Sequence, residues 1–424
     1  MTAHRPGGGE MRLGARGTGR ADVLDDPLDD VRASFLRLAE RFHPEEARGL
    51  DATFVIEVDG HHPMTVHVRG NRCLVSPGSS RVAGASLVAS PATWVDLVEG
   101  RVDGIAAFLA GRLKITGDLN LAARFETLFR PTEHAARVVR TRETTIRGAR
   151  IESTVAGRGT PVVLLHGLGA TKVSFLPTLD GLADRYEVHA LDLPGFGKSS
   201  KPLPTGRRYS MGWFADAVHG YLVANDLQDA HLVGNSMGGR IALETALRHP
   251  GSVRSVVGLG PAVGFDEYRL LGPLLRLTQS QWVGLMPAPM SRTMIEGLVR
   301  DLFYDPSRVP AANYEAAAND VLLAMRDPAH RLALLACARR LGSERARGKR
   351  AYWHRLAELA TPSFWIFGTH DRLVSSRYAA RVERILPAAQ VEVWSEMGHV
   401  PQFEAPERTN TSLSTWFAGV DAGR

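Results

Sequence analysis

Residues 231 to 240 read HLVGNSMGGR and contain the pattern Gly-x-Ser-x-Gly centred on Ser236. An apolar run precedes the serine and the helical pattern MGGRIALETALRHP follows it, which predicts a buried strand, a sharp turn and a helix. In that context the serine adopts a strained backbone, and Gly234 and Gly238 are needed because side chains there would collide with it. Ser236 is therefore a candidate nucleophile, whereas a serine in an ordinary glycine-rich turn needs none of this context.

A nucleophilic serine needs a base to take its proton and a carboxylate to orient that base. GTHDRLV places Asp371 after the next-to-last predicted strand, and SEMGHVPQFEAPE places His399 after the last one. We expect Ser236 to attack, His399 to act as general base and then general acid, and Asp371 to orient and stabilise the imidazolium. His370 is the alternative base, but a side chain next to the acid in sequence points elsewhere.

From residue 144 onward, short apolar strands alternate with helical stretches. This alternation of strands and helices indicates a mostly parallel sheet covered by helices on both faces. TIRGARIESTVAGRG predicts an opening hairpin. The strands after it are predicted at PVVLLHG, YEVHALDLPG, AHLVG, VRSVVGLG, PSFWIFG and AQVEVW. Asp371 and His399 then lie at the same sheet edge as the serine.

Residues 144 to 421 resemble the α/β-hydrolase family, through the order Ser, Asp, His, through HGLG at 166 to 169 and through DLPGFGKS at 192 to 199. The resemblance implies an α/β-hydrolase fold with a helical cap, and it requires no cofactor and no metal. It also implies that the backbone N–H groups of Leu168 and Met237 form the oxyanion hole. His166 and Gly167 would support that loop, with His166 ordering it rather than acting as an acid or base.

Residues 263 to 360 lie between two predicted strands and are far more than a crossover needs, so we expect a mostly helical cap there. Some relatives carry the acid after an earlier strand, which leaves Asp266 as the alternative acid. LLGPLLRLTQSQWVGLMPAPM either lines an apolar acyl pocket or closes a helical core of its own. RRLGSERARGKR, at 339 to 350, is strongly basic and is either a solvated surface or a docking segment for anionic lipid.

The first part of the chain has a different pattern. A helix is predicted from Asp29 to Phe42, followed by a meander of antiparallel strands, the strand ASLVA, and a helix that begins at Pro91 after the N-cap Ser90. A further helix ending at Gly111, an extended piece through Ile115 and a last helix with an apolar stripe complete this part. The apolar faces of these elements by themselves predict a core.

Residues 28 to 130 resemble the sterol-carrier-protein lipid-binding domain, through the strand meander, ASLVAS and the run GRLKITGD at 111 to 118. The resemblance implies a small α+β domain with an apolar tunnel that accepts a fatty-acyl or other lipid chain. The alternative is that the same faces only close a core. The predicted organisation is a flexible tail at 1 to 27, this domain at 28 to 130, a linker at 131 to 143 and the hydrolase domain at 144 to 421.

Composition excludes several classes of protein. The 51 Lys and Arg residues exceed the 45 Asp and Glu residues only slightly, which does not indicate a nucleic-acid binder. Cys73 and Cys337 lie far apart in apolar segments, so we expect buried thiols rather than a disulfide or a zinc site. The Gly/Arg-rich start lacks the apolar core of a secretory signal, and no apolar run reaches transmembrane length, so a cytoplasmic protein is expected. The oligomeric state stays open.

The residue at 236 limits the chemistry. Relatives that open epoxides or cleave carbon–halogen bonds use aspartate as the nucleophile, so serine favours acyl chemistry. A lipid-holding domain ahead of a serine hydrolase favours a carboxylic ester of a hydrophobic or lipid-like substrate. The alternatives are a C–C bond hydrolase of ring-fission diketones and a lipid carrier with an inactive hydrolase module. The C–C hydrolases usually have tryptophan after the catalytic histidine, where this chain has Val400, and a more glycine-rich oxyanion loop than HGLGA.

Overall fold

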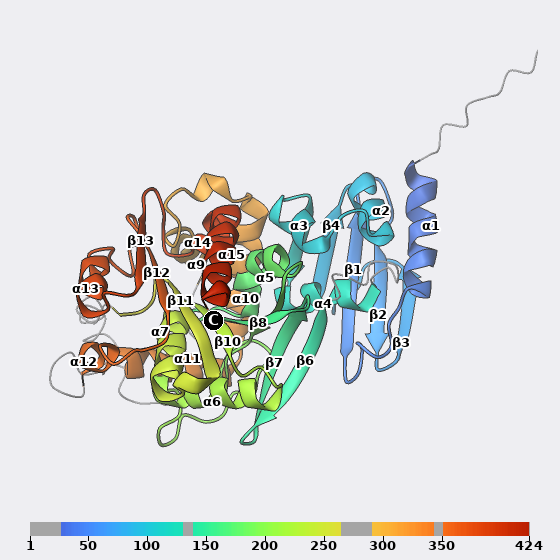
Figure 1. Cartoon of the computed structure of the whole chain (residues 1–424). Helices are drawn as coiled ribbons and strands as arrows, with labels where there is room; N and C mark the ends of the chain where they lie inside the picture. The colour runs from blue at the N-terminus through green and yellow to red at the C-terminus, as the bar shows by residue number, and fades with distance from the viewer. Residues whose placement is uncertain (1–26, 130–138, 264–290, 343–350, 424) are drawn as a thin grey trace, which may run out of the picture.

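The computed structural model describes residues 27–129, 139–263, 291–342 and 351–423. Two separate sheets organise this part of the chain, one of five strands and one of eight strands. Figure 1 shows the five-stranded sheet in blue and teal at one end of the molecule and the larger sheet beside it. Residues 1 to 26 of the predicted tail, residues 131 to 138 of the predicted linker and the apolar run at 270 to 290 lie outside the described residues.

The first domain is a mixed sheet covered by helices, with the strand order β3-β2-β1-β4-β5. β1 and β4 pair in parallel, and the other pairs are antiparallel. Its elements are α1 (Pro27–Glu40), β1 (Asp51–Val58), β2 (Met64–Arg69), β3 (Arg72–Pro77), β4 (Ala85–Ala89), α2 (Pro91–Glu99), α3 (Gly104–Leu109), β5 (Leu113–Gly117) and α4 (Leu119–Phe129). These elements match the predicted order, and the α+β fold is confirmed.

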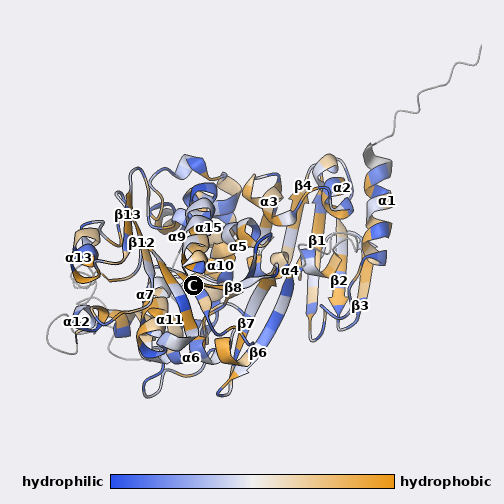
Figure 2. Cartoon of the chain, in the orientation of Figure 1, coloured by the Kyte–Doolittle hydropathy of each residue, from blue (hydrophilic) through white to orange (hydrophobic). Residues whose placement is uncertain are grey.

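Local signals in this domain act as predicted. The Ser90 hydroxyl accepts a hydrogen bond from the Thr93 N–H, and Pro91 occupies the first turn of α2. In β1, the alternating residues Phe54, Ile56 and Val58 are all buried. Figure 2 shows the amphipathic pattern of α1, whose hydrophobic and hydrophilic residues alternate along the helix.

The second domain is built on a sheet in the order β13-β12-β11-β10-β8-β9-β7-β6. β6 and β7 form an antiparallel hairpin, and β7 pairs antiparallel with β9; all the remaining pairs are parallel. Its strands are β6 (Arg140–Ile146), β7 (Ala149–Ala156), β8 (Thr160–Leu165), β9 (Tyr186–Leu191), β10 (Ala230–Asn235), β11 (Val253–Leu259), β12 (Ser363–Gly368) and β13 (Gln390–Trp394). Every strand predicted from the apolar runs is present.

Helices cover both faces of this sheet. Those outside the cap are η2 (Lys172–Phe175), α5 (Leu176–Leu182), α6 (Met211–Ala224), α7 (Met237–Arg248), η3 (Pro250–Ser252), α13 (Tyr378–Ile385), α14 (Pro401–Glu404) and α15 (Pro406–Ala422). The described part of the cap, inserted between β11 and β12, comprises α9 (Arg292–Arg300), η5 (Pro306–Arg308), α10 (Ala311–Arg326), α11 (Pro328–Gly342) and α12 (Tyr352–Leu356). The mostly parallel sheet with a helical cap is therefore confirmed.

Two details differ from the sequence prediction. Residues 140 to 143, assigned to the linker, belong to the edge strand β6, where Arg140 pairs with Val155 of β7. Their polar composition hid the strand, because an edge strand with a solvent-facing side needs few apolar residues, and Figure 2 shows hydrophilic colouring along β6. Of the two thiols, Cys337 is buried as expected, but Cys73 on the edge strand β3 is only partly buried.

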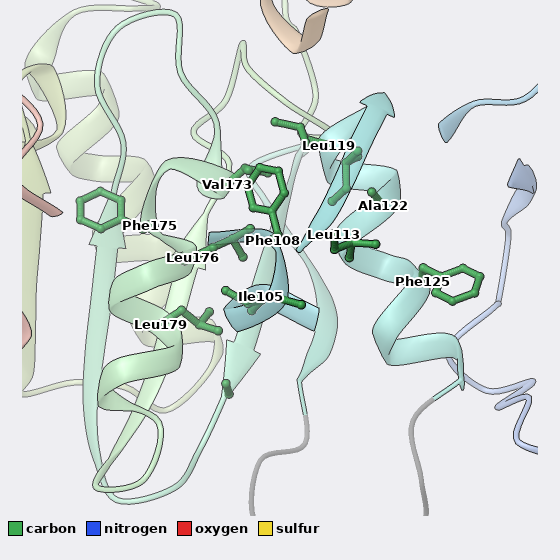
Figure 3. Packing of buried hydrophobic residues seen from close by; sticks show 14 of the residues in the cluster. Ile105, Phe108, Leu113, Leu119, Ala122, Phe125, Val173, Phe175, Leu176 and Leu179 are labelled. Carbon is green, nitrogen blue, oxygen red and sulfur yellow. The ribbon is translucent and has the colours of Figure 1, made fainter. Parts of the chain in front are cut away.

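The two domains are in direct contact. Ile105 and Phe108 of α3 pack beside Leu176 of α5, and Figure 3 shows these side chains meeting between the two sets of ribbons. The cap also reaches the first domain, because the Asn313 side chain on α10 donates to the Leu109 carbonyl at 3.4 Å. A single apolar core thus continues from one domain into the next.

A buried ionic network crosses the same interface. Lys172 Nζ donates to Asp192 Oδ2 at 2.6 Å, to Glu152 Oε1 at 3.0 Å and to Asn120 Oδ1 at 3.1 Å, and Asn120 belongs to the first domain. Burial alone would lower the pKa of Lys172, but the charges of Asp192 and Glu152 outweigh it and raise that pKa. The lysine therefore stays charged, and it satisfies both buried carboxylates.

We predict that Lys172→Met lowers the free energy of unfolding by about 3 to 5 kcal/mol, because Asp192 and Glu152 lose their buried counter-charge. Lys198→Met is the matched control: Lys198 pairs with Asp118 across the same interface, but its side chain is 41% exposed, so the expected loss is under about 1 kcal/mol. Urea denaturation of the full chain measures both. Equal losses of stability in the two variants would contradict the role of Lys172 as the buried counter-charge of Asp192 and Glu152.

Candidate active site

Ser236 occupies the sharp turn between β10 and α7. Its backbone has φ 53° and ψ −118°, a left-handed conformation that is strained for a residue with a side chain. The Ser236 N–H donates to the Leu259 carbonyl at 3.0 Å, and the Ser236 carbonyl accepts from Arg240 at 3.1 Å and from Ala262 at 2.9 Å. Ser236 is half-buried, whereas its neighbours on both sides are buried. Of these three residues, only the serine is therefore accessible from outside the turn.

The two glycines of the pattern allow this turn to be so tight. A Cβ on Gly234 would lie 2.2 Å from the carbonyl carbon of Gly238, and a Cβ on Gly238 would lie 1.9 Å from the Leu165 carbonyl oxygen at the end of β8. Both contacts are with backbone atoms, which cannot move aside as a flexible side chain would. The requirement inferred from the sequence for Gly234 and Gly238 is thus a steric fact of the fold.

Asp371 and His399 form a close, buried pair. The His399 Nδ1 and the Asp371 Oδ2 are 2.7 Å apart, and both side chains are almost completely inaccessible. Asp371 Oδ1 accepts from the backbone N–H groups of Leu373 and Val374, each at 2.8 Å. One carboxylate oxygen is therefore fixed by backbone donors, and the other is left to hold the imidazole.

The end of β11 brings this pair to the serine. Leu259 accepts the Ser236 N–H, and the next residue is Gly260, at which a Cβ would lie 3.0 Å from Asp371 Oδ2 and 3.3 Å from His399 Nδ1. Gly260 also has φ 49°, where a side chain is disfavoured. The sheet thus gathers Ser236, Asp371 and His399 around one strand end, as expected from their order in the chain.

Two further residues position the histidine, and the sequence analysis missed both. The Asn235 side-chain amide, next to the serine, donates to the carbonyls of Leu259 and His399, each at 2.9 Å. The buried Glu404 carboxylate accepts from Gly398 at 2.8 Å and from Tyr304 and Asp305 at 3.0 Å each. These side chains tie the histidine loop to the nucleophile turn and to the cap. The only sequence signal for them was their proximity to Ser236 and His399.

The loop after β8 approaches the serine from the other side. A Cβ on Gly167 would lie 3.3 Å from the Ser236 Cβ. His166 Nε2 accepts from the Leu193 N–H at 3.0 Å, so its proton is on Nδ1, which donates to the Gly167 carbonyl at 2.8 Å. Burial lowers the pKa of His166, which keeps the ring neutral. Its ring thus fixes the conformation of the loop.

The two predicted oxyanion donors are the backbone N–H groups of Leu168, in the loop after β8, and of Met237, next to Ser236. Leu168 follows Gly167 directly, and Met237 is the first residue of α7, where the N–H groups of the first turn have no carbonyl to bond within the helix. Within the described ranges, neither N–H donates to a backbone carbonyl. The positive end of the α7 dipole also favours negative charge beside Met237.

The alternative residues lie elsewhere or outside the described part. His370 is exposed; its Nδ1 bonds the Thr369 hydroxyl at 2.9 Å, and its ring packs on Tyr304. Asp266 lies outside the described residues, as does most of the basic run at 339 to 350. Val400, which occupies the place of the tryptophan expected of C–C hydrolases, packs on a small cluster formed by Phe303, Val309 and Tyr314.

The described cap residues contact the site directly. The Leu302 carbonyl, just after α9, accepts the His399 N–H at 2.6 Å. On the other side, a Cβ on Gly169 would lie 3.5 Å from Leu334 of α11, so this helix covers the loop that follows β8. The cap segment proposed to line an acyl pocket lies outside the described residues, and that pocket remains a prediction.

A second candidate site lies in the first domain. A cavity of about 480 Å³ is enclosed mainly by α2, α3, β5 and α4. Its wall is largely apolar and includes Trp94, Phe108, Ile115 and Phe125. The volume lies within the range of roughly 300 to 1,000 Å³ that is common for small-molecule sites. The resemblance to the sterol-carrier-protein domain implied an apolar tunnel in this domain. The alternative interpretation of the same apolar faces was a closed core.

The fold and the arrangement of Ser236, Asp371 and His399 define a hydrolase of the α/β class. Residues 160–406 match the alpha/beta hydrolase fold family, and residues 35–130 match the SCP-2 sterol transfer family. The chain therefore belongs to the α/β-hydrolase family and carries an SCP-2 domain ahead of the hydrolase domain.

Individual relatives differ in chemistry. The chain is 33% identical to a 2-hydroxy-6-oxononadienedioate/2-hydroxy-6-oxononatrienedioate hydrolase of Paraburkholderia phymatum, over 61% of this chain and 87% of the relative. It is 28% identical to a pimeloyl-[acyl-carrier protein] methyl ester esterase of Aeromonas hydrophila subsp. hydrophila, over 59% of this chain and 93% of the relative. The family thus includes C–C and ester hydrolases.

Solved structures give the same fold. A bacterial membrane phospholipase A superposes with a TM-score of 0.54 at 25% identity, over 67% of this chain and 87% of the other. The meta-cleavage product hydrolase CumD superposes with a TM-score of 0.55 at 22% identity, over 66% of this chain and 98% of the other.

Membrane-spanning helices and clusters of metal-binding side chains are both absent from the described residues. No helix among them is both long and apolar enough to cross a membrane. Within the same ranges, no group of three or more His, Cys, Asp or Glu side chains is arranged to hold a metal ion.

We predict that Gly238→Ala lowers the free energy of unfolding by more than about 4 kcal/mol, since the added methyl group would overlap the backbone at the end of β8. Gly251→Ala is the matched control, because a Cβ there meets nothing within 4 Å, and its effect should stay within about 0.5 kcal/mol. Thermal and urea unfolding of both variants measure the difference. A folded Gly238→Ala protein of unchanged stability would rule out the close backbone contact between Gly238 and the end of β8.

Proposed function

We propose that this α/β hydrolase cleaves a carboxylic ester of a hydrophobic or lipid-like substrate through an acyl-enzyme intermediate. The observation that carries the proposal is the 2.7 Å contact between His399 and Asp371 at the strand end that also holds the strained Ser236 turn. A serine, an imidazole and a buried carboxylate in these roles form the template of serine acyl transfer on unrelated folds.

In the proposed reaction, the Ser236 Oγ attacks the ester carbonyl while His399 Nε2 takes its proton. Asp371 holds the imidazole with Nδ1 protonated and stabilises the imidazolium. The Leu168 and Met237 N–H groups stabilise the negative charge on the tetrahedral oxygen. His399 then protonates the departing alcohol, leaving the acyl group on Ser236. Water, deprotonated by His399, releases the carboxylic acid and restores the serine.

The first domain supports the hydrophobic substrate class. It matches the SCP-2 sterol transfer family and encloses an apolar cavity. Leu176 of α5 in the hydrolase domain lines that same cavity, so the lipid-binding domain and the hydrolase are physically joined at the ligand site. A domain that holds water-insoluble molecules beside a hydrolase is useful when the substrate is itself poorly soluble.

A second candidate function is hydrolytic C–C cleavage of ring-fission diketones. The relative from Paraburkholderia phymatum favours it, because it is a C–C hydrolase at 33% identity. Val400 argues against it, since it stands where such hydrolases usually have tryptophan. A third candidate, a lipid carrier with an inactive hydrolase module, is disfavoured because Ser236, Asp371 and His399 are all present.

Substitution of the two histidines tests the assignment of the base. His399→Ala should lower kcat for p-nitrophenyl ester hydrolysis by at least about a hundredfold, because proton transfer contributes roughly 10² to 10⁴ to such rates. His370→Ala is the matched control next to the acid and should change kcat by less than about threefold, since its ring bonds Thr369 instead. A large loss in His370→Ala with an active His399→Ala would reverse the assignment.

The same assay separates the candidate reactions. Hydrolysis of p-nitrophenyl esters of increasing chain length, abolished in Ser236→Ala and fastest for long chains, is the result expected of a lipid esterase. Ring-fission diketone turnover without ester turnover would instead establish C–C hydrolysis. Failure of a fluorophosphonate to label Ser236 in the folded protein would support the carrier.

A further inference from the structure

The cavity of the first domain contains an acidic side chain in an otherwise apolar wall. Glu126 lies on α4 between Phe125 and Phe129 along the cavity wall. Its surface is partly accessible although protein surrounds the carboxyl group, because that surface faces the cavity. Burying a carboxyl group in an apolar wall is unfavourable unless it is hydrogen-bonded.

Two residues at the start of α3 lie beside the Glu126 carboxyl group. Its Oε2 lies against Gly104, and Gly104, Asp103 and Glu126 line the same stretch of the cavity wall. Gly104 leaves the necessary space, because a Cβ there would lie 2.8 Å from Glu126 Oε2. Asp103 is itself fixed, since its Oδ1 accepts the Ala106 N–H at 3.0 Å and caps α3. The carboxyl pair is therefore a built part of the cavity wall.

Two neighbouring buried carboxyl groups disfavour double ionisation, so a proton on one of them is favoured. Burial, and after it the negative charge of Asp103, raises the pKa of Glu126 well above its usual value. Asp180 of α5 adds to this effect, and the rim of the cavity carries the further carboxyl group of Asp184. The pair thus offers acceptor oxygens, and a proton donor when one carboxyl group is protonated, beside the further carboxyl groups of Asp180 and Asp184.

Among the described residues that line the cavity, Arg101 is the basic one, and its guanidinium group already bonds Asp96 and Glu99 at the surface. The apolar remainder of the wall, which includes Leu97, Ile105 and Phe129, suits a hydrocarbon body. A ligand that fills this space must therefore place its polar group at the carboxyl pair or leave the buried carboxyls unmatched.

We propose that the Glu126–Asp103 pair is the polar anchor of this cavity and selects a neutral, hydroxyl-bearing lipid over a fatty-acid anion of the same length. A hydroxyl group can accept from the protonated carboxyl and donate to its partner. A carboxylate would bring another negative charge beside Asp103 and would have to gain a proton to bind. The inference concerns binding alone, so it does not depend on the proposed ester hydrolysis.

Competition binding with the full chain tests the proposal. Dodecanol and dodecanoate, each below its solubility or micelle limit at pH 8, displace the neutral fluorescent probe N-phenyl-1-naphthylamine. We expect dodecanol to displace the probe at a concentration at least tenfold lower than dodecanoate. Equal or stronger displacement by dodecanoate would overturn the proposal, and so would displacement by neither molecule. Neither molecule is an ester, so a failed hydrolase assay would not affect this result.

Two variants connect the preference to the carboxyl pair. Glu126→Leu should weaken dodecanol binding about tenfold and remove the preference, whereas Glu126→Gln should keep it within about threefold because the amide still donates and accepts. Glu57→Gln on β1, outside the residues that line the cavity, controls for loss of an acidic group elsewhere. A preference retained in Glu126→Leu would place the selectivity elsewhere, and near-ultraviolet circular dichroism verifies that each variant is folded.

Discussion

The crossing of β10, α7 and the end of β8 is the constraint on which the candidate active site depends. With Gly234 and Gly238, the backbones approach to distances that no side chain would allow, and Ser236 is forced into its left-handed conformation. The cost of that strain is met by the parallel sheet and by the helix that follows. Because backbone contacts fix the turn, the position of the Ser236 backbone does not depend on how neighbouring side chains are arranged.

The remaining reactive groups reach the serine through the strand order of the sheet. β11, β12 and β13 follow β10 in that order across the sheet and all pair in parallel, so the loops after these strands open at one edge. Gly260 lets Asp371 and His399 approach the strand end that holds Ser236. The Asn235 amide and the Glu404 carboxylate then fix the histidine loop through backbone contacts. Parallel strands thus convert separations of more than a hundred residues into contacts.

The first domain contacts the hydrolase domain through a hydrogen bond and through a shared cavity wall. Asn120 on α4 accepts a hydrogen bond from Lys172, which follows the loop beside Ser236. The same helix lines the apolar cavity, and Leu176 of the hydrolase domain completes the cavity wall. A ligand in the cavity would therefore contact elements that also support the candidate active site.

The sequence by itself determined the order of strands and helices, the Ser236 turn and the chain order of the serine, the acid and the base. Apolar periodicity and steric rules for glycine act within a few residues, so they can be read locally. It predicted the hairpin of β6 and β7 but assigned residues 140 to 143, the polar start of β6, to the linker, because that start is recognised only by its pairing with β7. Only the tertiary structure decided that Asn235 bonds the His399 loop, that Lys172 meets Asn120 and that Glu126 faces a cavity. Those facts depend on burial and on contacts between distant segments, which no local pattern encodes.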